Sequence, residues 1–179
     1  MADPTSRIRP AEPADARALA VIHVTCWRAA YAGIMPDALL AGLSVEDRER
    51  SWRRNLETPA SSEGHTWLVE VAGRALGFAS TGPCRDADRP SGFELWALYL
   101  DPAAWGRGLG RALMAFVLAD AAARGHDTLS LWVLDGNTRG RRFYEAAGFR
   151  ADGGAKIEIE GGAELPHLRY RGVTGIAAE

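Results

Sequence analysis

The spacing of apolar residues divides the chain into short strands and longer helices. Two helices stand out, over 14–31 and 108–124, because apolar residues recur every three or four positions on one face of each. The apolar face of the first consists of Leu19, Ile22, Cys26 and Ala30. That of the second consists of Leu109, Leu113, Val117 and Ala121, with Met114 and Leu118 beside them. We expect each helix to bury this face.

Strands are predicted where apolar runs are bounded by glycine, proline or aspartate. Ala72-Gly73 is a hairpin signal, and 84–92 is typical of a turn region. The predicted strands are 7–9, 65–71, 74–81, 93–100, 129–134, 155–160 and 165–172. Further helices are expected at 45–55 and 137–147, with short helical pieces between 33 and 42. The order of these elements predicts an α/β protein of the α+β type, a mixed sheet flanked by helices.

Composition narrows the class of protein. With 179 residues, 47% of them hydrophobic, we expect one domain over 1–179. The longest apolar run is far below the ~20 residues of a membrane span, and the N-terminus lacks the apolar stretch of a signal peptide. The cysteines are Cys26 and Cys84, without the spacing of a metal site or a disulfide framework. These features predict a cytoplasmic protein that needs neither a membrane nor a metal.

Net charge is −2 over the whole chain, which argues against binding nucleic acid by neutralising phosphates. The charge is unevenly distributed, however. Residues 101–150 carry seven basic and five acidic side chains, and the segments on both sides are mildly acidic. The excess of basic side chains in segment 101–150 makes this segment the candidate for binding an anion.

A glycine-rich loop lies inside this basic segment, between a predicted strand and the helix over 108–124. Gly106, Gly108 and Gly110 free backbone amides to surround an anion at the helix N-terminus, where the helix dipole favours negative charge. Arg107 and Arg111 lie in or beside the first turn, where a bound anion would offset their positive charge. The run does not fit a dinucleotide-binding or a nucleotide P-loop pattern. A merely flexible turn is the structural alternative.

Two motifs resemble the GCN5-related N-acetyltransferase (GNAT) family. The segment 98–102 followed by 106–110 resembles the family's acyl-CoA-binding core, with Trp105 where the family usually has Gln or Arg. Asn137 begins a second run, which is similar to the family pattern N-x-x-A-x-x-x-Y-x-x-x-G-F, with Gly140 in place of the usual Ala. Together they cover a predicted CoA-binding core of about 94–150.

The resemblance implies how acetyl-CoA would be held. The strand around Tyr99 would open at a bulge and offer its backbone to the pantetheine arm, and Tyr144 would give a proton to the CoA sulfur. A core aromatic role is the alternative for Tyr144, and a helix cap the alternative for Asn137. The residues expected to contact acetyl-CoA are Leu98, Tyr99, Leu100, Gly106, Arg107, Gly108, Leu109, Gly110, Arg111 and Asn137.

Glu94 is the candidate base, because period two would place it on the same face as Leu98 and an apolar run would raise its pKa. A salt-bridged carboxylate, or a water chain in place of one base, is the alternative. Trp27 and Tyr31 are candidate acceptor-binding residues, since they resemble the opening of acetyltransferases that modify polyamines or other small amines. Simple packing against the sheet, which is the commoner role of such a stripe, is the alternative for these two rings.

The sequence thus predicts acetyl transfer from acetyl-CoA to a primary amine of a small molecule, polyamine-like or otherwise, by direct attack in a ternary complex. Two alternatives on the same fold are a non-catalytic acyl-CoA sensor and an acetyltransferase of protein N-termini or lysines. A dinucleotide-dependent oxidoreductase is disfavoured by Arg111 and by the antiparallel strands before the loop. The C-terminal strands are compatible with a homodimer.

Overall fold

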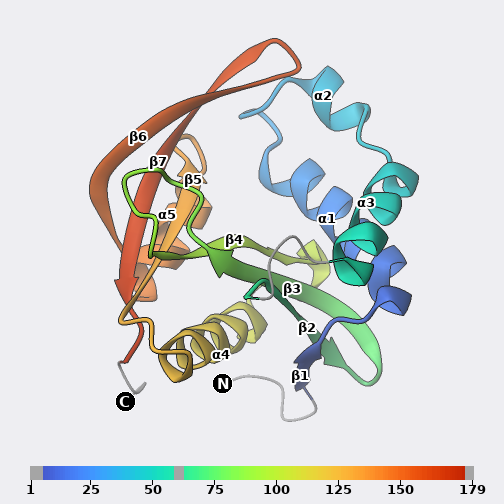
Figure 1. Ribbon diagram of the computed structural model, residues 1–179. Helices are drawn as coiled ribbons and strands as arrows, with labels where there is room; N and C mark the ends of the chain where they lie inside the picture. The colour runs from blue at the N-terminus through green and yellow to red at the C-terminus, as the bar shows by residue number, and fades with distance from the viewer. Residues whose placement is uncertain (1–5, 59–62, 176–179) are drawn as a thin grey trace.

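A twisted mixed sheet forms the centre of the fold (Figure 1), as seen in a computed structural model that describes residues 6–58 and 63–175. The strands follow the spatial order β1-β2-β3-β4-β5-β7-β6, and β4 with β5 is the parallel pair among them. The strands are β1 (Ser6–Pro10), β2 (His65–Val71), β3 (Arg74–Pro83), β4 (Phe93–Leu100), β5 (Thr128–Leu134), β6 (Arg150–Glu160) and β7 (Ala163–Val173).

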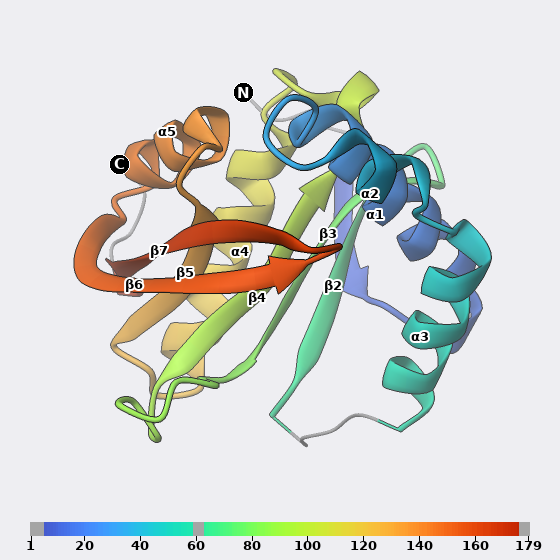
Figure 2. The same cartoon turned by 90° about the horizontal axis from the view of Figure 1, so that it is seen from above.

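Helices cover both faces of this sheet (Figure 2). The first three pack on one face, where Leu19 and Ile22 meet Leu68 and Phe78, whereas α4 packs on the other face against β3, β4 and β5. The helices are α1 (Ala16–Ala30), α2 (Asp37–Ala41), α3 (Val45–Glu57), α4 (Leu109–Ala123) and α5 (Thr138–Ala146), with 3-10 turns at Pro13–Asp15 and Pro102–Ala104. The predicted α/β class and element order are confirmed.

Strand β4 carries a bulge at its middle. Leu95 pairs with Thr81 and Ala97 with Ser80, so Trp96 is an extra residue without a counterpart on β3. Its pairing with β5 covers only Phe93–Leu95, after which the two parallel strands separate. The predicted bulge therefore lies where β4 leaves β5, and a bulge of this kind exposes backbone groups that a regular ladder would pair.

The bulge also reverses which side chains face which layer. Phe93 and Leu95, before it, and Leu98, after it, all pack into the core beneath α4, whereas Tyr99 packs on the α1 face. Glu94 alternates with its neighbours and so points toward the α1 face. The prediction that Glu94 shares a face with Leu98 is wrong, because period two holds only within an unbroken ladder.

The last two strands are longer than predicted and form a hairpin with β6 at the sheet edge. Gly153 has a φ of +89° beside a register shift in β6, which explains why the apolar alternation reveals only the second half of this strand. Ile157 and Ile159 on β6 are 62% and 71% exposed. The homodimer stays a prediction. Within residues 6–58 and 63–175, no helix is long and apolar enough to cross a membrane.

Candidate active site

The glycine-rich loop adopts the conformation that an anion site requires. Gly106 and Gly108 have φ values of +76° and +80°, a region that side chains with a Cβ rarely occupy. Gly108 is the N-cap of α4, and no described side chain caps this helix end. The first turn holds Arg111 and no acidic residue. Uncapped amides and the helix dipole are therefore directed at the loop, where they favour a phosphate.

Trp105 links this loop to the second motif. Its indole Nε1 donates to the Leu100 carbonyl over 3.2 Å, and the guanidinium of Arg139 lies 3.7 Å above the ring. Gly110, on the first turn of α4, lies so close to α5 that a Cβ there would stand 3.3 Å from the Phe143 ring. The loop, the end of β4 and the start of α5 are thus held as one unit.

A cavity of about 320 Å³ begins at this loop and runs along the opening between β4 and β5. Almost all residues that the sequence assigned to acetyl-CoA line it. They are Leu98, Tyr99, Leu100, Gly106, Gly108, Leu109, Gly110, Arg111 and Asn137. Tyr144 and Tyr31 also line it. Arg107 is not among the described lining residues, although it stands in the loop.

Asn137 combines the two roles that the sequence left open. Its Oδ1 accepts a hydrogen bond from the Gly140 amide over 2.9 Å, so it caps α5, and the same side chain lines the cavity. A Cβ at position 140 would stand 2.6 Å from Asn137 Nδ2. Glycine in place of the usual alanine therefore leaves room for this orientation of the Asn137 amide.

Tyr144 is placed on the cavity wall, with its ring edge-on to Phe143 and Phe149. Burial, and next the neighbouring Tyr99 and Cys26, raise the pKa of the Tyr144 phenol well above its ordinary value. A phenol with a raised pKa keeps its proton at neutral pH, so Tyr144 can act as a donor within the cavity.

Several lining residues were not predicted as site residues. They include Arg139, which follows Asn137 in the second motif, and Cys26, which belongs to the apolar face of the first predicted helix. Cys26 is buried, and burial raises the pKa of its thiol to about 11, so it stays a neutral wall residue. The only signal for Arg139 was its position within the second motif. The other unpredicted lining residues include Trp96, Trp132, Val133 and Phe143.

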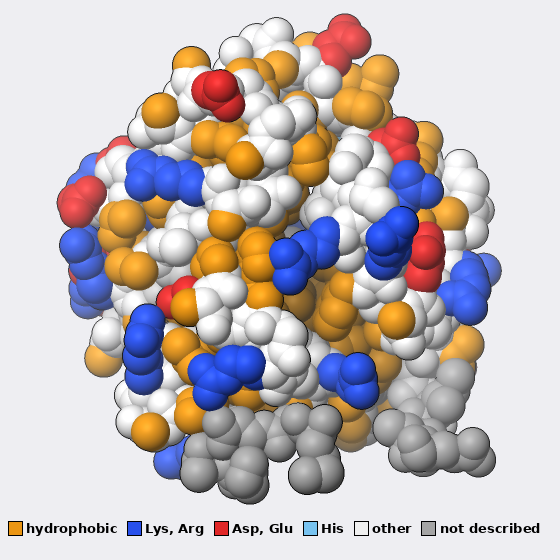
Figure 3. Space-filling view, turned by 180° about the vertical axis from the view of Figure 1, so that it is seen from behind, with side chains coloured by type: hydrophobic (Ala, Val, Ile, Leu, Met, Phe, Trp, Pro, Cys, Tyr) orange, Lys and Arg blue, Asp and Glu red, His pale blue; other side chains and the backbone are white. Residues whose placement is uncertain are grey.

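Basic side chains accompany the site at the surface. Figure 3 shows a face on which Lys and Arg side chains border a hollow with hydrophobic walls. Arg111 and Arg139 belong to the cavity wall itself, and no Asp or Glu is found among the described residues of that wall. Two of the basic side chains of segment 101–150 thus lie on the wall of the cavity, where they would attract an anionic ligand.

A second cavity, of about 460 Å³, lies between α1, α3 and strands β2 to β4. It shares Trp96, Ala97 and Tyr99 with the first cavity, so the two meet at the bulge of β4. The remaining described lining residues are Pro10, Ala11, His23, Trp52, Asn55, Leu56, Gly64, His65, Thr66, Trp67, Ser80 and Arg85. A group seated at the bulge is accessible from both cavities.

His23 is the buried polar residue of this second cavity. Its ring lies 5.0 Å from Tyr99 and 5.1 Å from Trp27, and neither ring nitrogen has a hydrogen-bond partner within the described residues. Burial, with a smaller contribution from Arg48, lowers the pKa of His23 to about 3. Trp27 packs beside Tyr31 at 5.3 Å and is not among the described lining residues of either cavity.

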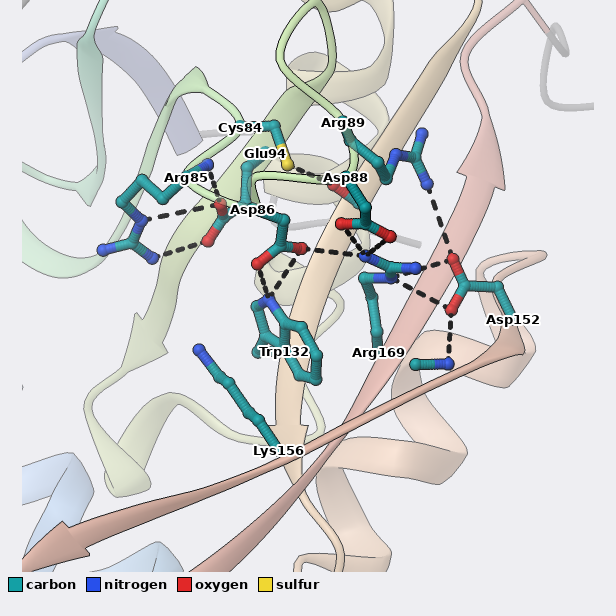
Figure 4. Close-up of polar contacts among 12 residues, drawn as sticks. Cys84, Arg85, Asp86, Asp88, Arg89, Glu94, Trp132, Asp152, Lys156 and Arg169 are labelled. Carbon is teal, nitrogen blue, oxygen red and sulfur yellow. Dashed lines mark hydrogen bonds and ion pairs between the residues drawn. The ribbon is translucent and has the colours of Figure 1, made fainter.

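Glu94 makes a buried ion pair, which was the alternative to the base. Its carboxylate accepts from the Arg85 backbone amide at 3.0 Å and from Arg85 Nη2 at 2.5 Å (Figure 4). The Glu94 side chain is 1% exposed and is not among the described lining residues of either cavity. Its role as a base stays a prediction.

Comparison with known proteins agrees with this geometry. Residues 27–149 match the acetyltransferase (GNAT) family. The chain is 29% identical over 170 residues to Rv2775 of Mycobacterium tuberculosis, named a probable N-acetyltransferase, with 92% of each chain covered. It superposes on a GCN5-related N-acetyltransferase from Rhodopseudomonas palustris with a TM-score of 0.76 at 24% identity, covering 97% and 98% of the two chains.

YncA of Salmonella typhimurium, solved with its cofactor acetyl-CoA, has a TM-score of 0.68 at 20% identity, and the match covers 98% of this chain and 97% of YncA. The fold is thus shared with an acetyl-CoA-bound protein, and in this chain the loop, the split strands and both motifs border one cavity. The chain therefore belongs to the acetyltransferase (GNAT) family and is an acyl-CoA-dependent N-acetyltransferase.

Proposed function

We propose that the protein transfers the acetyl group of acetyl-CoA to a primary amine of a small molecule, by direct attack within a ternary complex. The observation that carries this proposal is the meeting of two cavities at Trp96, Ala97 and Tyr99. One has the features of a CoA site, and the other offers a separate entrance for an acceptor. Two reactants can therefore meet at β4 without an intermediate carried by the protein.

The phosphate end of acetyl-CoA would be bound by the loop and by the N-terminus of α4. Backbone amides at Gly108 and Gly110 supply hydrogen bonds there, and Arg111 and Arg139 add charge. Arg139 is fixed by its stack on Trp105. At the other end, the bulge leaves β4 backbone groups near Ala97 available for the pantetheine arm and the thioester.

Acetyl-CoA supplies an acetyl group activated as a thioester. In the transfer, the amine nitrogen bonds to the acetyl carbon, the carbon–sulfur bond breaks, the amine loses one proton and the sulfur gains one. Backbone amides of the opened β4 near Tyr99 would stabilise the negative charge that develops on the thioester oxygen. Tyr144, whose phenol is protonated at neutral pH and lines the cavity, is the proposed donor to the sulfur.

The proton of the amine leaves through the second cavity in this proposal. Glu94 does not line that cavity, and its carboxylate is occupied by Arg85. Water in the second cavity is therefore the immediate proton acceptor that we propose.

Thiol release from acetyl-CoA, measured with polyamines, amino acids, aminoglycosides and N-terminal peptides, tests the proposal. The expected result is thiol release with a small-molecule amine, together with its N-acetyl product in the mass spectrum. Tight acetyl-CoA binding without thiol release in any arm would favour a sensor module. Release with the peptides alone would favour a protein acetyltransferase.

A further inference from the structure

The walls of the second cavity indicate what kind of amine it accepts. Three indole rings, from Trp52, Trp67 and Trp96, line it, and no Asp or Glu is found among its lining residues within 6–58 and 63–175. Aromatic walls bury apolar groups well. A polycationic acceptor would find no carboxylate on these walls, so the cavity suits an apolar body better than a chain of ammonium groups.

Arg85 brings a positive charge to this cavity in a fixed position. Glu94 engages its Nε and Nη2 atoms, and the guanidinium lies 5.5 Å from the Trp96 ring. Its Nη1 makes no hydrogen bond within the described residues, and the side chain is 62% exposed. The outer edge of the guanidinium is thus free to bind a carboxylate end-on, while the inner edge is held by a buried carboxylate.

The loop that carries Arg85 is itself anchored (Figure 4). Asp86 accepts from Trp132 Nε1 and from Arg169 Nη1, each at 3.1 Å, and Asp88 accepts from the same Arg169 atom at 2.9 Å. These contacts tie the segment between β3 and β4 to β5 and β7. Glu158 also faces Arg85, but it is ion-paired with Lys156 at 2.7 Å, so it competes weakly for Arg85.

His23 adds an acceptor of hydrogen bonds. It is 8% exposed, lines the cavity, and has two ring nitrogens without a partner in the described part of the chain. Burial, and next the positive charge of Arg48 on α3, keep the ring neutral. A neutral imidazole can accept a hydrogen bond from an amine, and unpartnered buried nitrogens indicate a ligand or water that supplies one.

We infer that the acceptor is an amine that carries a carboxylate on an apolar or aromatic body, as in a free amino acid of this type. Arg85 binds the carboxylate, the three indoles contact the body, and His23 accepts a hydrogen bond from the amine nitrogen. The inference rests on the proposed function and replaces the polyamine-like acceptor by an amino acid. A cavity without lining carboxylates also favours the uncharged amine, which is the nucleophilic form.

Matched pairs of acceptors test this inference. L-phenylalanine is compared with phenethylamine and L-tryptophan with tryptamine, because each pair differs only in the carboxylate, and spermidine is a polyamine reference. We expect kcat/KM, from thiol release, to be at least tenfold higher for the amino acid of each pair, as a charge-assisted hydrogen bond predicts. Equal values within the pairs, or spermidine as the best acceptor, would overturn the inference.

The variant that isolates Arg85 is Arg85→Gln combined with Glu94→Gln, because Arg85→Gln alone would leave a buried carboxylate unpaired. The expected result is that the amino-acid preference falls to about one while the circular-dichroism spectrum is kept. The readout is a ratio, so a general loss of rate does not disturb it. Arg7→Gln, which removes an exposed arginine outside the cavity lining, should keep the preference.

Two failures are distinguishable. Absence of thiol release with every amine, while acetyl-CoA still binds by calorimetry, would refute the proposed function. Thiol release with an unchanged amino-acid preference in the double variant would refute the role of Arg85 alone. A higher kcat/KM for N-terminal peptides than for free amino acids would overturn the inference and indicate that the acceptor is a protein.

Discussion

Arg139 stacks on Trp105, with its guanidinium carbon 3.7 Å from the ring centroid, so one contact joins the phosphate loop to the start of α5. Trp105 stands where related acetyltransferases usually have Gln or Arg. The indole of Trp105 lacks the polar side-chain group of Gln or Arg. It instead positions Arg139, an arginine of the second motif, at the cavity wall.

Removal of this stack should weaken acetyl-CoA binding. A cation–π contact at an exposed site contributes about 0.5–1 kcal/mol, so Trp105→Ala should raise the KM for acetyl-CoA about two- to fivefold through loss of Arg139 placement. Arg139→Gln should raise the KM at least as much. Arg142→Gln removes an exposed arginine on the same helix that does not line the cavity, and it should leave the KM unchanged. Equal KM values for Arg139→Gln and Arg142→Gln would contradict this role.

Tyr144→Phe tests the proton donor. The substitution keeps the ring contacts with Phe143 and Phe149, so the fold and the KM for acetyl-CoA should change little. General acid catalysis typically contributes 10²- to 10⁴-fold, so kcat should fall by about 10²-fold or more. Initial rates of thiol release measure this change. Full activity of the phenylalanine variant would remove the acid role from Tyr144.

Much of this architecture is predictable because its signals are local. Residues only a few positions apart in the chain determine the apolar faces of α1 and α4, the glycine-rich loop and the cap of α5. Gly106 and Gly108 have the positive φ values that their pattern predicts. These elements bring both motifs to the same cavity.

The orientation of Glu94 was not predictable in the same way. The bulge at Trp96 arises from the register with Ser80 and Thr81 on β3, a relationship between segments some fifteen residues apart in the chain. The sequence alone does not reveal this pairing. Side chains along 93–100 are then expected to alternate between the two faces of the sheet without interruption, which places Glu94 on the wrong face. The stack of Arg139 on Trp105 is equally a tertiary event, so an arginine on a polar helix gave no sign of it.

The Glu94→Gln variant distinguishes two roles for Glu94, that of a catalytic base and that of a residue that positions Arg85. Because the carboxylate binds Arg85 and is not among the described lining residues, we expect kcat to be largely kept and the KM for an amino-acid acceptor to rise about threefold or more. The pH profile of kcat should keep its acid limb. A base would give the opposite pattern, with a fall in kcat of at least 10²-fold and loss of that limb at saturating acceptor.

The lowered pKa of His23 predicts that the stability of the protein depends on pH. Its folded pKa of about 3 is below the ordinary 6.5, so in this interval the unfolded chain binds a proton that the folded protein excludes. Stability contributed by His23 is therefore complete above pH 6.5 and is lost as the pH falls. From pH 6.5 to 5 the loss is about 2 kcal/mol in the free energy of unfolding.

Urea denaturation at pH 7, 6 and 5, followed by circular dichroism, measures this loss. His23→Asn removes the titrating group, so its free energy of unfolding should fall less steeply with acidification than that of the wild-type chain. His65, whose pKa burial also lowers, adds a contribution of the same sign in both proteins and cancels in the comparison. Parallel pH curves for the two proteins would contradict the prediction.

Two substitutions separate the two functions of Asn137, which caps α5 and lines the first cavity. Asn137→Asp keeps an oxygen that accepts from the Gly140 amide, so the melting temperature should be preserved, but it replaces the amide donor by a charged acceptor. The KM for acetyl-CoA should then rise about two- to tenfold, as expected for one lost hydrogen bond. Asn137→Ala should show the same rise together with a loss of about 1 kcal/mol in stability. If Asn137→Asp binds acetyl-CoA as tightly as the wild-type chain, the side chain serves α5 alone.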